Sequence, residues 1–308
     1  MMRAWRKFKE SYLLYSFLHD KVAIVSFTIL LVLVVGSFSA PLIAPHDPYD
    51  TATIDIMNSE LPPFLLGNGS GSSEFPLGTD SQGRDMLSTM LYGMRISILI
   101  GLGAVAMQAA LGIMLGLLAG YIGKKVDAVL MRLADIQLSF STMMVAIVLS
   151  AVFQSMFGVG RYEEMAVPFL IIVIGIAEWP QYARTVRASV MAERKKEYVE
   201  AARVIGFSSS RIMWRHILPN TLSPILVIST VQVANAVMSE AALSFLGLGM
   251  PPTQPSLGSL INSGFEYIFS GSWWITIFPG ILLVVLILVI NLLGDWLRDV
   301  LNPKLYKG

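Results

Sequence analysis

Few side chains of this sequence are of the types and spacings that carry out covalent chemistry. The 308 residues include no cysteine and only three histidines, His19, His46 and His216, which lie far apart along the chain. Thiol nucleophiles are therefore excluded, and a zinc or haem site is not expected. The Gly-x-x-x-x-Gly-Lys-Ser/Thr phosphate loop, the His-Glu-x-x-His zinc motif and the Gly-x-Ser-x-Gly nucleophile motif are all missing. We predict no catalytic residue, no cofactor and no metal on this chain.

One carboxylate, Glu240, lies in an apolar stretch from residue 217 to residue 265 that holds no other acid. Ionisable side chains inside a membrane are costly, and they mark functional sites by default. If Pro219 is at the inner surface, the helix covers about 31 Å by Glu240, which places this residue at the outer interface. We favour an outer-gate or loop-bracing role over a proton relay, with a solvated helix end as the alternative. The other candidates for lining a pathway are Gln232, Asn235 and Ser244.

Small residues at one helical spacing point to close helix packing. Gly112, Gly116 and Gly120 recur every four residues, so they share one face of a helix and let another helix approach closely. Packing inside this subunit's own bundle is the favoured interpretation. The alternative is contact with a partner subunit across a pathway.

The elements that position these residues are membrane helices. The chain is 55% hydrophobic and 14% charged, with a mean hydropathy of +0.65. Long segments without any charge match the roughly 20 apolar residues that cross a bilayer. The near-neutral balance of 22 basic and 21 acidic residues excludes a nucleic-acid binder built on bulk charge. We predict an all-α integral membrane protein with six spans, at 22–40, 96–121, 138–157, 165–183, 220–239 and 275–294.

The positions of the basic residues set the orientation, because basic loops stay in the cytoplasm. The N-terminus, the loops 122–137 and 184–219 and the C-terminal tail hold 19 of the 22 basic residues. Both ends are therefore predicted to be cytoplasmic, and the first span is an uncleaved anchor. The fourth span is expected to end at the interface at Glu178–Pro180, segment 41–94 to have little regular structure, and 241–274 to form an outer loop.

The inner loop 184–219 predicts two short helices around a sharp turn. Tyr198–Val204 is a strong helix former that stops at Gly206, and Ser208–Ser210 can cap a second helix. Such a hairpin can press an apolar face into a groove on a partner protein. For the loop's basic residues we favour contact with anionic lipid over salt bridges to a partner. These residues are Arg184, Arg187, Arg194, Lys195 and Lys196.

The loop resembles the EAA loop of permease subunits of binding-protein-dependent ABC importers. That pattern is Glu-Ala-Ala, three residues, Gly, nine residues, Ile, one residue and Leu-Pro. The sequence matches it with Glu200-Ala201-Ala202, Gly206 and Leu218-Pro219, and departs from it with His216 at the Ile position. In the family, this loop docks into a cleft on the ATP-binding subunit and transmits its closure. The resemblance implies a coupling role for Glu197, Tyr198, Glu200, Ala201, Ala202, Gly206, Phe207, Ser208, Arg211, Leu218 and Pro219.

Further motifs are similar to the "C" permease of the dipeptide, oligopeptide and nickel branch. They are Leu77-Gly-Thr-Asp-Ser-Gln-Gly-Arg-Asp85, Leu243–Gly249 with Pro251-Pro252, and Gly294–Asp299 with Asn302-Pro303-Lys304. Two positions depart from the usual residues, with Ser141 in place of Pro and Asn302 in place of Asp. The resemblance covers nearly the whole chain.

The resemblance implies a type I ABC importer permease fold in a bacterial cytoplasmic (inner) membrane. It divides the chain into an N-terminal anchor (1–40), an extracytoplasmic loop (41–94), the permease core (95–295) and a cytoplasmic tail (296–308). The implied partners are a second homologous permease, two ATP-binding subunits that carry ATP and Mg, an extracytoplasmic solute-binding protein and membrane lipid, with no nucleic acid. Short peptides are the favoured solute, and nickel chelates or glutathione remain open. A self-contained secondary transporter is the alternative from another class.

Overall fold

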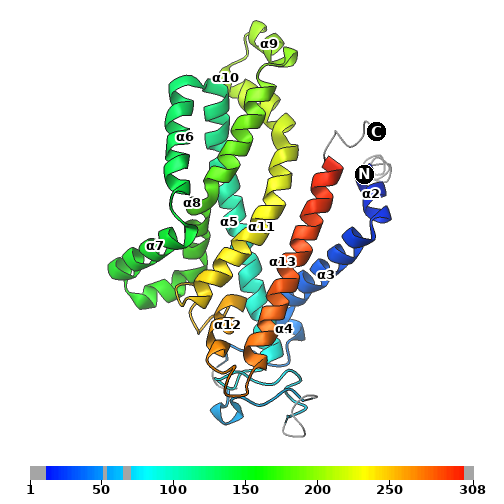
Figure 1. Ribbon diagram of the computed structural model, residues 1–308, viewed down its shortest axis with the longest axis vertical. Coiled ribbons are helices and arrows are strands. Elements are labelled where there is room, and N and C mark those ends of the chain that lie inside the picture. The colour runs from blue at the N-terminus through cyan, green and yellow to red at the C-terminus, as the bar shows by residue number, and fades with distance from the viewer. Residues whose placement is uncertain (1–11, 51–53, 65–70, 302–308) are drawn as a thin grey trace. The chain divides into compact units, whose positions relative to one another are not determined.

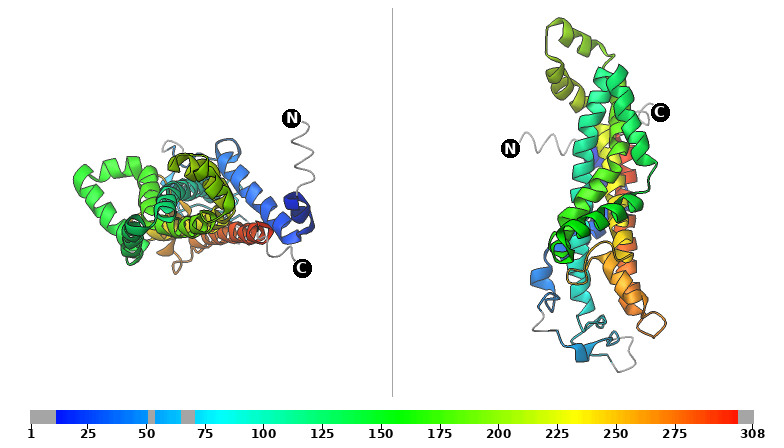
Figure 2. Two further views of the ribbon diagram at one scale, coloured as in Figure 1. Left: turned by 90° about the horizontal axis from the view of Figure 1, so that it is seen from above. Right: turned by 90° about the vertical axis from the view of Figure 1, so that its left-hand side faces the viewer.

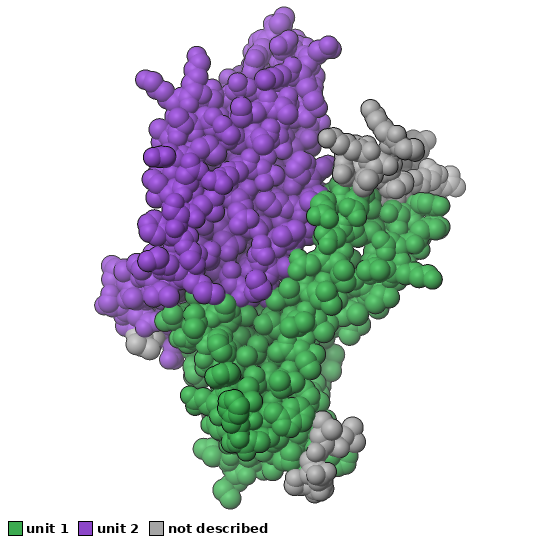
Figure 3. Space-filling model, viewed as in Figure 1, with its two compact units in different colours: residues 1–99, 240–308 green, residues 100–239 purple. Residues whose placement is uncertain are grey.

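The computed structural model describes residues 12–50, 54–64 and 71–301, and these are mostly helical (Figure 1). The charged N-terminal residues Arg3, Arg6, Lys7 and Lys9 and the motif Asn302–Lys304 lie outside the described residues. Two compact units divide the chain, residues 1–99 with 240–308 and residues 100–239 (Figure 3). Helices α5 (Met86–Ile122) and α11 (Leu222–Phe245) pass from one unit into the other.

The unit of residues 1–99 and 240–308 is built around the pairing of α13 with α3 and α12. Its helices are α2 (Tyr12–His19), α3 (Lys21–Phe38), α4 (Ala40–Ile43), the short 3-10 helix η1 (Ile56–Asn58), α12 (Leu257–Phe265) and α13 (Trp274–Leu301), with the ends of α5 and α11. Asp20 caps α3 by accepting hydrogen bonds from the amides of the next turn, which satisfies donors that the helix leaves free. Met86, Leu260, Trp274 and Ile275 form the buried core where α5, α12 and α13 meet.

The unit of residues 100–239 holds the inner part of α5, most of α11 and the segments between them. These segments are α6 (Lys124–Leu138), α7 (Thr142–Phe157), α8 (Val159–Glu193), α9 (Glu197–Val204), α10 (Ser209–Arg211), the π-helix η2 (Ile212–Ile217) and the 3-10 helix η3 (Leu218–Thr221). Helix α8 packs against both α6 and α7, and α9 packs against η2. In Figures 1 and 2, α9 lies beyond the neighbouring ends of α5 and α8.

Within the described residues, five helices are long and apolar enough to cross a membrane. They are Lys21–Phe38, Met86–Ile122, Gly160–Glu193, Ser209–Phe245 and Trp274–Leu301. The third predicted span, 138–157, corresponds to α7, which follows α6 after a bend of 85°. Helices α6 and α7 together make a sixth crossing if they form one span. Many large apolar side chains of these helices are exposed on the chain, as expected of surfaces that face lipid or other subunits.

Three expectations about helix boundaries are wrong. Residues 122–137 are almost entirely helix α6 rather than a loop, and a helix occupies Leu257–Phe265 within the predicted outer loop. The fourth span does not end at Glu178–Pro180, because α8 continues to Glu193 with Pro168 and Pro180 inside it. Proline is tolerated inside membrane helices, where neighbouring groups satisfy the carbonyl oxygens that it leaves free.

Candidate functional site

The predicted hairpin is present as α9, a turn and α10, at residues 197–211 (the 197–211 hairpin). Gly206 adopts a φ of +88°, a left-handed conformation that L side chains rarely adopt. The Phe207 amide donates to the Ala202 carbonyl at 3.1 Å, so the turn satisfies a carbonyl at the helix end. Ser208 then caps α10 by accepting from the Arg211 amide at 3.4 Å. The sharp reversal of the chain therefore depends on the glycine at position 206.

The two faces of α9 have different environments. Val199 and Ala202 are buried on the side that packs against η2. Glu197, Glu200 and Ala201 are exposed on the other side. The exposed fraction rises to 89% at Val204 and is 68% at the following Ile205. The hairpin thus presents two carboxylates beside an apolar tip, and Ala202 has a packing role inside the chain.

Hydrogen bonds fix the start of the hairpin to the end of α8. The Tyr198 hydroxyl donates to Glu193 Oε2 at 2.7 Å, and Lys196 Nζ lies 2.6 Å from Glu193 Oε1. Partial burial and the neighbouring Glu193 carboxylate raise the pKa of Tyr198 to about 12, so this hydroxyl keeps its proton at physiological pH. Arg194 donates to the Gly120 carbonyl at 2.9 Å, which joins the end of α5 to the same point.

The returning half of the hairpin is held by stacked rings. The Arg211 guanidinium lies 4.3 Å from the centre of the Phe207 ring, and the Phe207 and His216 rings stack at 5.6 Å. His216, which replaces the family's Ile, therefore packs against the hairpin. Leu218 is half-buried and Pro219 exposed in η3, ahead of α11.

The basic residues of the inner loop pair mostly within the chain. Arg184 forms an ion pair of 2.6 Å with Asp135 of α6, and Arg187 forms a two-point pair with Asp127 of the same helix. Lipid or partner contact, the two alternatives that the sequence suggested, therefore does not describe the main contacts of these two arginines. They attach α6 to α8.

The glycine stripe of α5 faces α8 of the same chain. A Cβ at Gly116 would lie 2.7 Å from both Val186 Cβ and the Ala183 carbonyl, and one at Gly120 would lie 2.8 Å from Val190 Cβ. A Cβ at Gly112 would likewise overlap the Cβ of Tyr182. The partner that approaches these glycines is thus α8, as the packing interpretation expects.

Glu240 braces the segment that follows α11. It is fully buried, which rules out the solvated helix end. Its carboxylate accepts from Ser97 Oγ at 2.8 Å and from Ser244 Oγ at 2.7 Å. Ser244 Oγ in turn accepts from the Met250 amide at 3.0 Å. The pathway candidate Ser244 therefore links Glu240 to the backbone of the Gly-Pro-rich segment.

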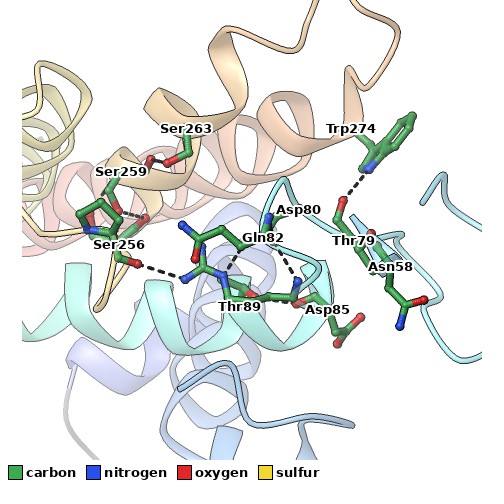
Figure 4. Close-up of polar contacts among 12 residues, drawn as sticks. Asn58, Thr79, Asp80, Gln82, Asp85, Thr89, Ser256, Ser259, Ser263 and Trp274 are labelled. Carbon is green, nitrogen blue, oxygen red and sulfur yellow. Dashed lines mark hydrogen bonds and ion pairs between the residues drawn. The ribbon is translucent and has the colours of Figure 1, made fainter. Parts of the chain in front are cut away.

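The outer motifs quoted above contact one another. Arg84 donates to Asp80 Oδ2 at 2.7 Å and to the Pro252 carbonyl at 3.1 Å, although the arginine and the aspartate are both buried. The indole of Trp274 donates to the Thr79 carbonyl at 3.0 Å (Figure 4). Segment 77–85, the Pro251-Pro252 turn and the start of α13 therefore form one hydrogen-bonded assembly.

A second buried glutamate, Glu178, lies in the middle of α8. Its oxygens accept from four neutral side chains. Among the described residues, no three His, Asp or Glu side chains form a group that could hold a metal ion.

Comparisons with known proteins agree with this geometry. Residues 112–307 match the family model of the binding-protein-dependent transport system inner membrane component. The chain belongs to this family. Residues 1–63 of the permease also match the N-terminal transmembrane domain of oligopeptide transport permease C. The permease is thus a multi-pass subunit of an ABC importer in a bacterial inner membrane.

Relatives of this permease are similar along most of their length. The di/tripeptide transport system permease protein DppC of Pseudomonas aeruginosa is 38% identical over 94% of this chain and 90% of the relative. The dipeptide transport system permease protein DppC of Haemophilus influenzae is 35% identical over 94% and 92%. A chain of the inward-facing MetNI methionine ABC transporter superposes with a TM-score of 0.55 at 20% identity, covering 70% of this chain and 98% of that chain. This last similarity confirms the type I fold.

Sequence reasoning located two members of the Glu178 surroundings, Gln232 and Asn235, but missed Glu178 itself. The apolar run ahead of Glu178 and Pro180 after it resembled the end of a span. The sequence does carry one signal. Glu178 lies inside the predicted span 165–183, about two helical turns before the basic residues Arg184 and Arg187.

Proposed function

We propose that this permease forms half of the translocation pathway of an ATP-driven importer of short peptides. The observation that carries the proposal is the 38% identity with a di/tripeptide permease over 94% of the chain. Nickel chelates and glutathione, which the sequence left open, are less well supported, because the relatives described above are permeases for peptides. The other half of the pathway is a second homologous permease, and an extracytoplasmic binding protein delivers the peptide.

The energy comes from two separate ATP-binding subunits, which hold ATP and Mg. The 197–211 hairpin provides the contact surface, since Glu197, Glu200 and Ala201 are exposed beside the apolar residues Val204 and Ile205. Binding of ATP to the partner changes the conformation of the permease only if the hairpin binds the ATP-bound and ATP-free states of the partner with different affinities. Charges at the rim and apolar residues at the centre are typical of such protein interfaces.

The rigid attachment of the hairpin allows a push on α9 to reach the membrane helices. Tyr198 and Arg194 join its base to α8 and to the end of α5, and Arg187 joins α8 to α6. Closure of the ATP-binding subunits would then move α5, α6 and α8 as a group, exchanging an inward-open for an outward-open pathway.

Reconstitution in liposomes tests this proposal. The complete transporter, with binding protein outside and ATP-binding subunits inside, is expected to accumulate labelled tri-alanine only when Mg-ATP is present in the same compartment as the ATP-binding subunits. The permeases alone should not accumulate it. Accumulation by the permeases alone, without ATP, would overturn the proposal in favour of a secondary transporter.

A further inference from the structure

The carboxylate of Glu178 is the centre of a polar cluster within the unit of residues 100–239. Gln108 Nε2 and Gln232 Nε2 donate to Glu178 Oε2 at 3.3 and 3.5 Å. Ser239 Oγ and Thr142 Oγ1 donate to Oε1 at 3.2 and 3.4 Å. Four helices, α5, α7, α8 and α11, therefore meet at one side chain. We call these five residues the Glu178 cluster.

The cluster lies inside the membrane-spanning part of its helices. Gln108 is 14 residues before the end of α5 at Ile122, which is about 21 Å along the helix axis. On α8, Glu178 is six residues before Arg184, the first basic residue of the inner loop, or about 9 Å. A carboxylate at such a depth is expensive to keep, so it indicates a function.

The carboxyl group of Glu178 has no cationic partner among the residues that the structure describes. The ion pairs formed there by the arginines, lysines and histidines all involve other acids. The four hydrogen bonds to Glu178 are longer than the 2.7–2.9 Å that is common for charge-assisted bonds. A buried, ionised carboxylate is stable when a positive charge pairs with it. The four donors to Glu178 are neutral, so they do not supply that charge.

The two oxygens of Glu178 face different surroundings. Oε2 faces Gln108 and Gln232, which are completely buried and also hydrogen-bond to each other at 3.2 Å. Oε1 faces Ser239 and Thr142, which are only half-buried. The Oε1 side is therefore the accessible edge of the cluster. Oε1 and the two hydroxyl oxygens offer three acceptors at this edge. The two glutamines bind the other carboxylate oxygen, Oε2, on the buried side.

We propose that the accessible edge of the Glu178 cluster binds a primary ammonium group of the transported peptide as it crosses the membrane. The inference rests on the proposed function. An ammonium carries one positive charge and three donors, which matches one carboxylate with two hydroxyl acceptors. A divalent metal would require more anionic or imidazole ligands than this single carboxylate provides. The ammonium belongs to the peptide N-terminus or to a lysine side chain.

The test uses the complete transporter in proteoliposomes, with its binding protein saturated by peptide. Uptake per ATP hydrolysed is compared for Ala-Ala-Ala, its N-acetylated form and N-acetyl-Ala-Lys-Ala. The variants are Glu178→Gln, which removes the charge, and Glu178→Asp, which keeps it. Glu164→Gln is the matched control, because Glu164 is an exposed carboxyl residue on the same helix.

Glu178→Gln is expected to lower Ala-Ala-Ala uptake per ATP by about tenfold, the loss of one charge-assisted contact. Glu178→Asp should retain most of the uptake, and Glu164→Gln all of it. N-acetyl-Ala-Ala-Ala should be transported equally by the wild type and Glu178→Gln. A Glu178-dependent uptake of N-acetyl-Ala-Lys-Ala identifies the lysine ammonium as a second source, and its absence assigns the site to the N-terminus.

Two results would overturn the inference while leaving the proposed function intact. One is unchanged Ala-Ala-Ala uptake by Glu178→Gln. The other is an equal loss for free and acetylated peptides together with a lower yield of assembled complex, because that pattern describes a purely structural network. A wild-type complex that imports none of the three peptides contradicts the proposed function instead.

Discussion

Replacing Gly116 by alanine is expected to separate α5 from α8. The added Cβ would lie 2.7 Å from Val186 Cβ and from the Ala183 carbonyl, whereas ordinary contacts of this kind begin at 3.4 Å. Neither neighbour is the end of a flexible side chain, so the helices must move apart by several tenths of an ångström. Overpacking of this type costs about 1–3 kcal/mol. For domains of 150–250 residues, each kcal/mol lowers the unfolding midpoint by about 2–4 °C.

Gly280→Ala is the matched control, because Gly280 lies inside α13 and a Cβ there meets nothing within 4 Å. Both substitutions gain the same helix propensity, about 1 kcal/mol in favour of alanine. The difference between their midpoints in detergent or nanodiscs therefore isolates the overlap with α8. We expect Gly280→Ala to equal or exceed the wild type and Gly116→Ala to fall below it. Equal midpoints for the two variants would refute the assignment of the stripe to α5–α8 packing.

Three further substitutions test the polar contacts. Glu240→Ala leaves two buried serine hydroxyls without their acceptor, so stability should fall by about 1–3 kcal/mol, with faster hydrogen exchange in segment 246–256. Asp127→Asn should lower the free energy of unfolding by about 1 kcal/mol, as measured by thermal unfolding. The loss should be smaller at high salt, because its partner Arg187 is partly exposed and salt screens the ion pair. Since the pKa of Tyr198 is raised to about 12, stability from its bond to Glu193 is fully present below pH 10 and is lost as pH rises toward 12. In Tyr198→Phe, the hydrogen-exchange protection of α9 should no longer fall between pH 10 and 12. The same pH dependence in Tyr198→Phe as in the wild type would contradict this role of Tyr198.

Much of the hairpin was predictable because its structure depends on local rules. A helix former followed by Gly206 and a serine cap specifies a helix, a left-handed turn and a second helix within fifteen residues. The same local reasoning cannot show that Ala202 faces η2 while Ala201 faces outward, because that depends on how α9 packs. The exposed and buried halves of the Glu-Ala-Ala motif thus became distinct only in the structure.

Charge gaps located the membrane helices but not their ends. Helix α6 was expected to be a loop because it carries charges, yet Asp127 and Asp135 pair with arginines of α8, which makes a charged helix stable there. Pro180 predicts a helix end in the sequence, but it lies inside α8, as proline can in membrane helices.

The two buried glutamates, Glu178 and Glu240, show more clearly what the sequence alone could not predict. Counting residues along one helix places Glu240 by depth but does not show its surroundings. Ser244 is one turn further along the same helix, whereas Ser97 comes from a segment 143 residues away. Glu178 was missed because its four neighbours come from three other helices, α5, α7 and α11, and no spacing rule connects Gln108 with Gln232.

The number of peptides imported per ATP hydrolysed by Glu200→Arg tests the central claim, coupling through the 197–211 hairpin, most directly. Glu200 is exposed on α9, so charge reversal should leave folding and membrane insertion intact. Glu164→Arg makes the same change on an exposed residue outside the hairpin. Loss of one hydrogen bond made by a charged group costs about 1.5–3 kcal/mol, so we expect the ratio to fall by about tenfold or more in Glu200→Arg and to stay at the wild-type value in Glu164→Arg. A wild-type ratio in Glu200→Arg would contradict coupling through the hairpin.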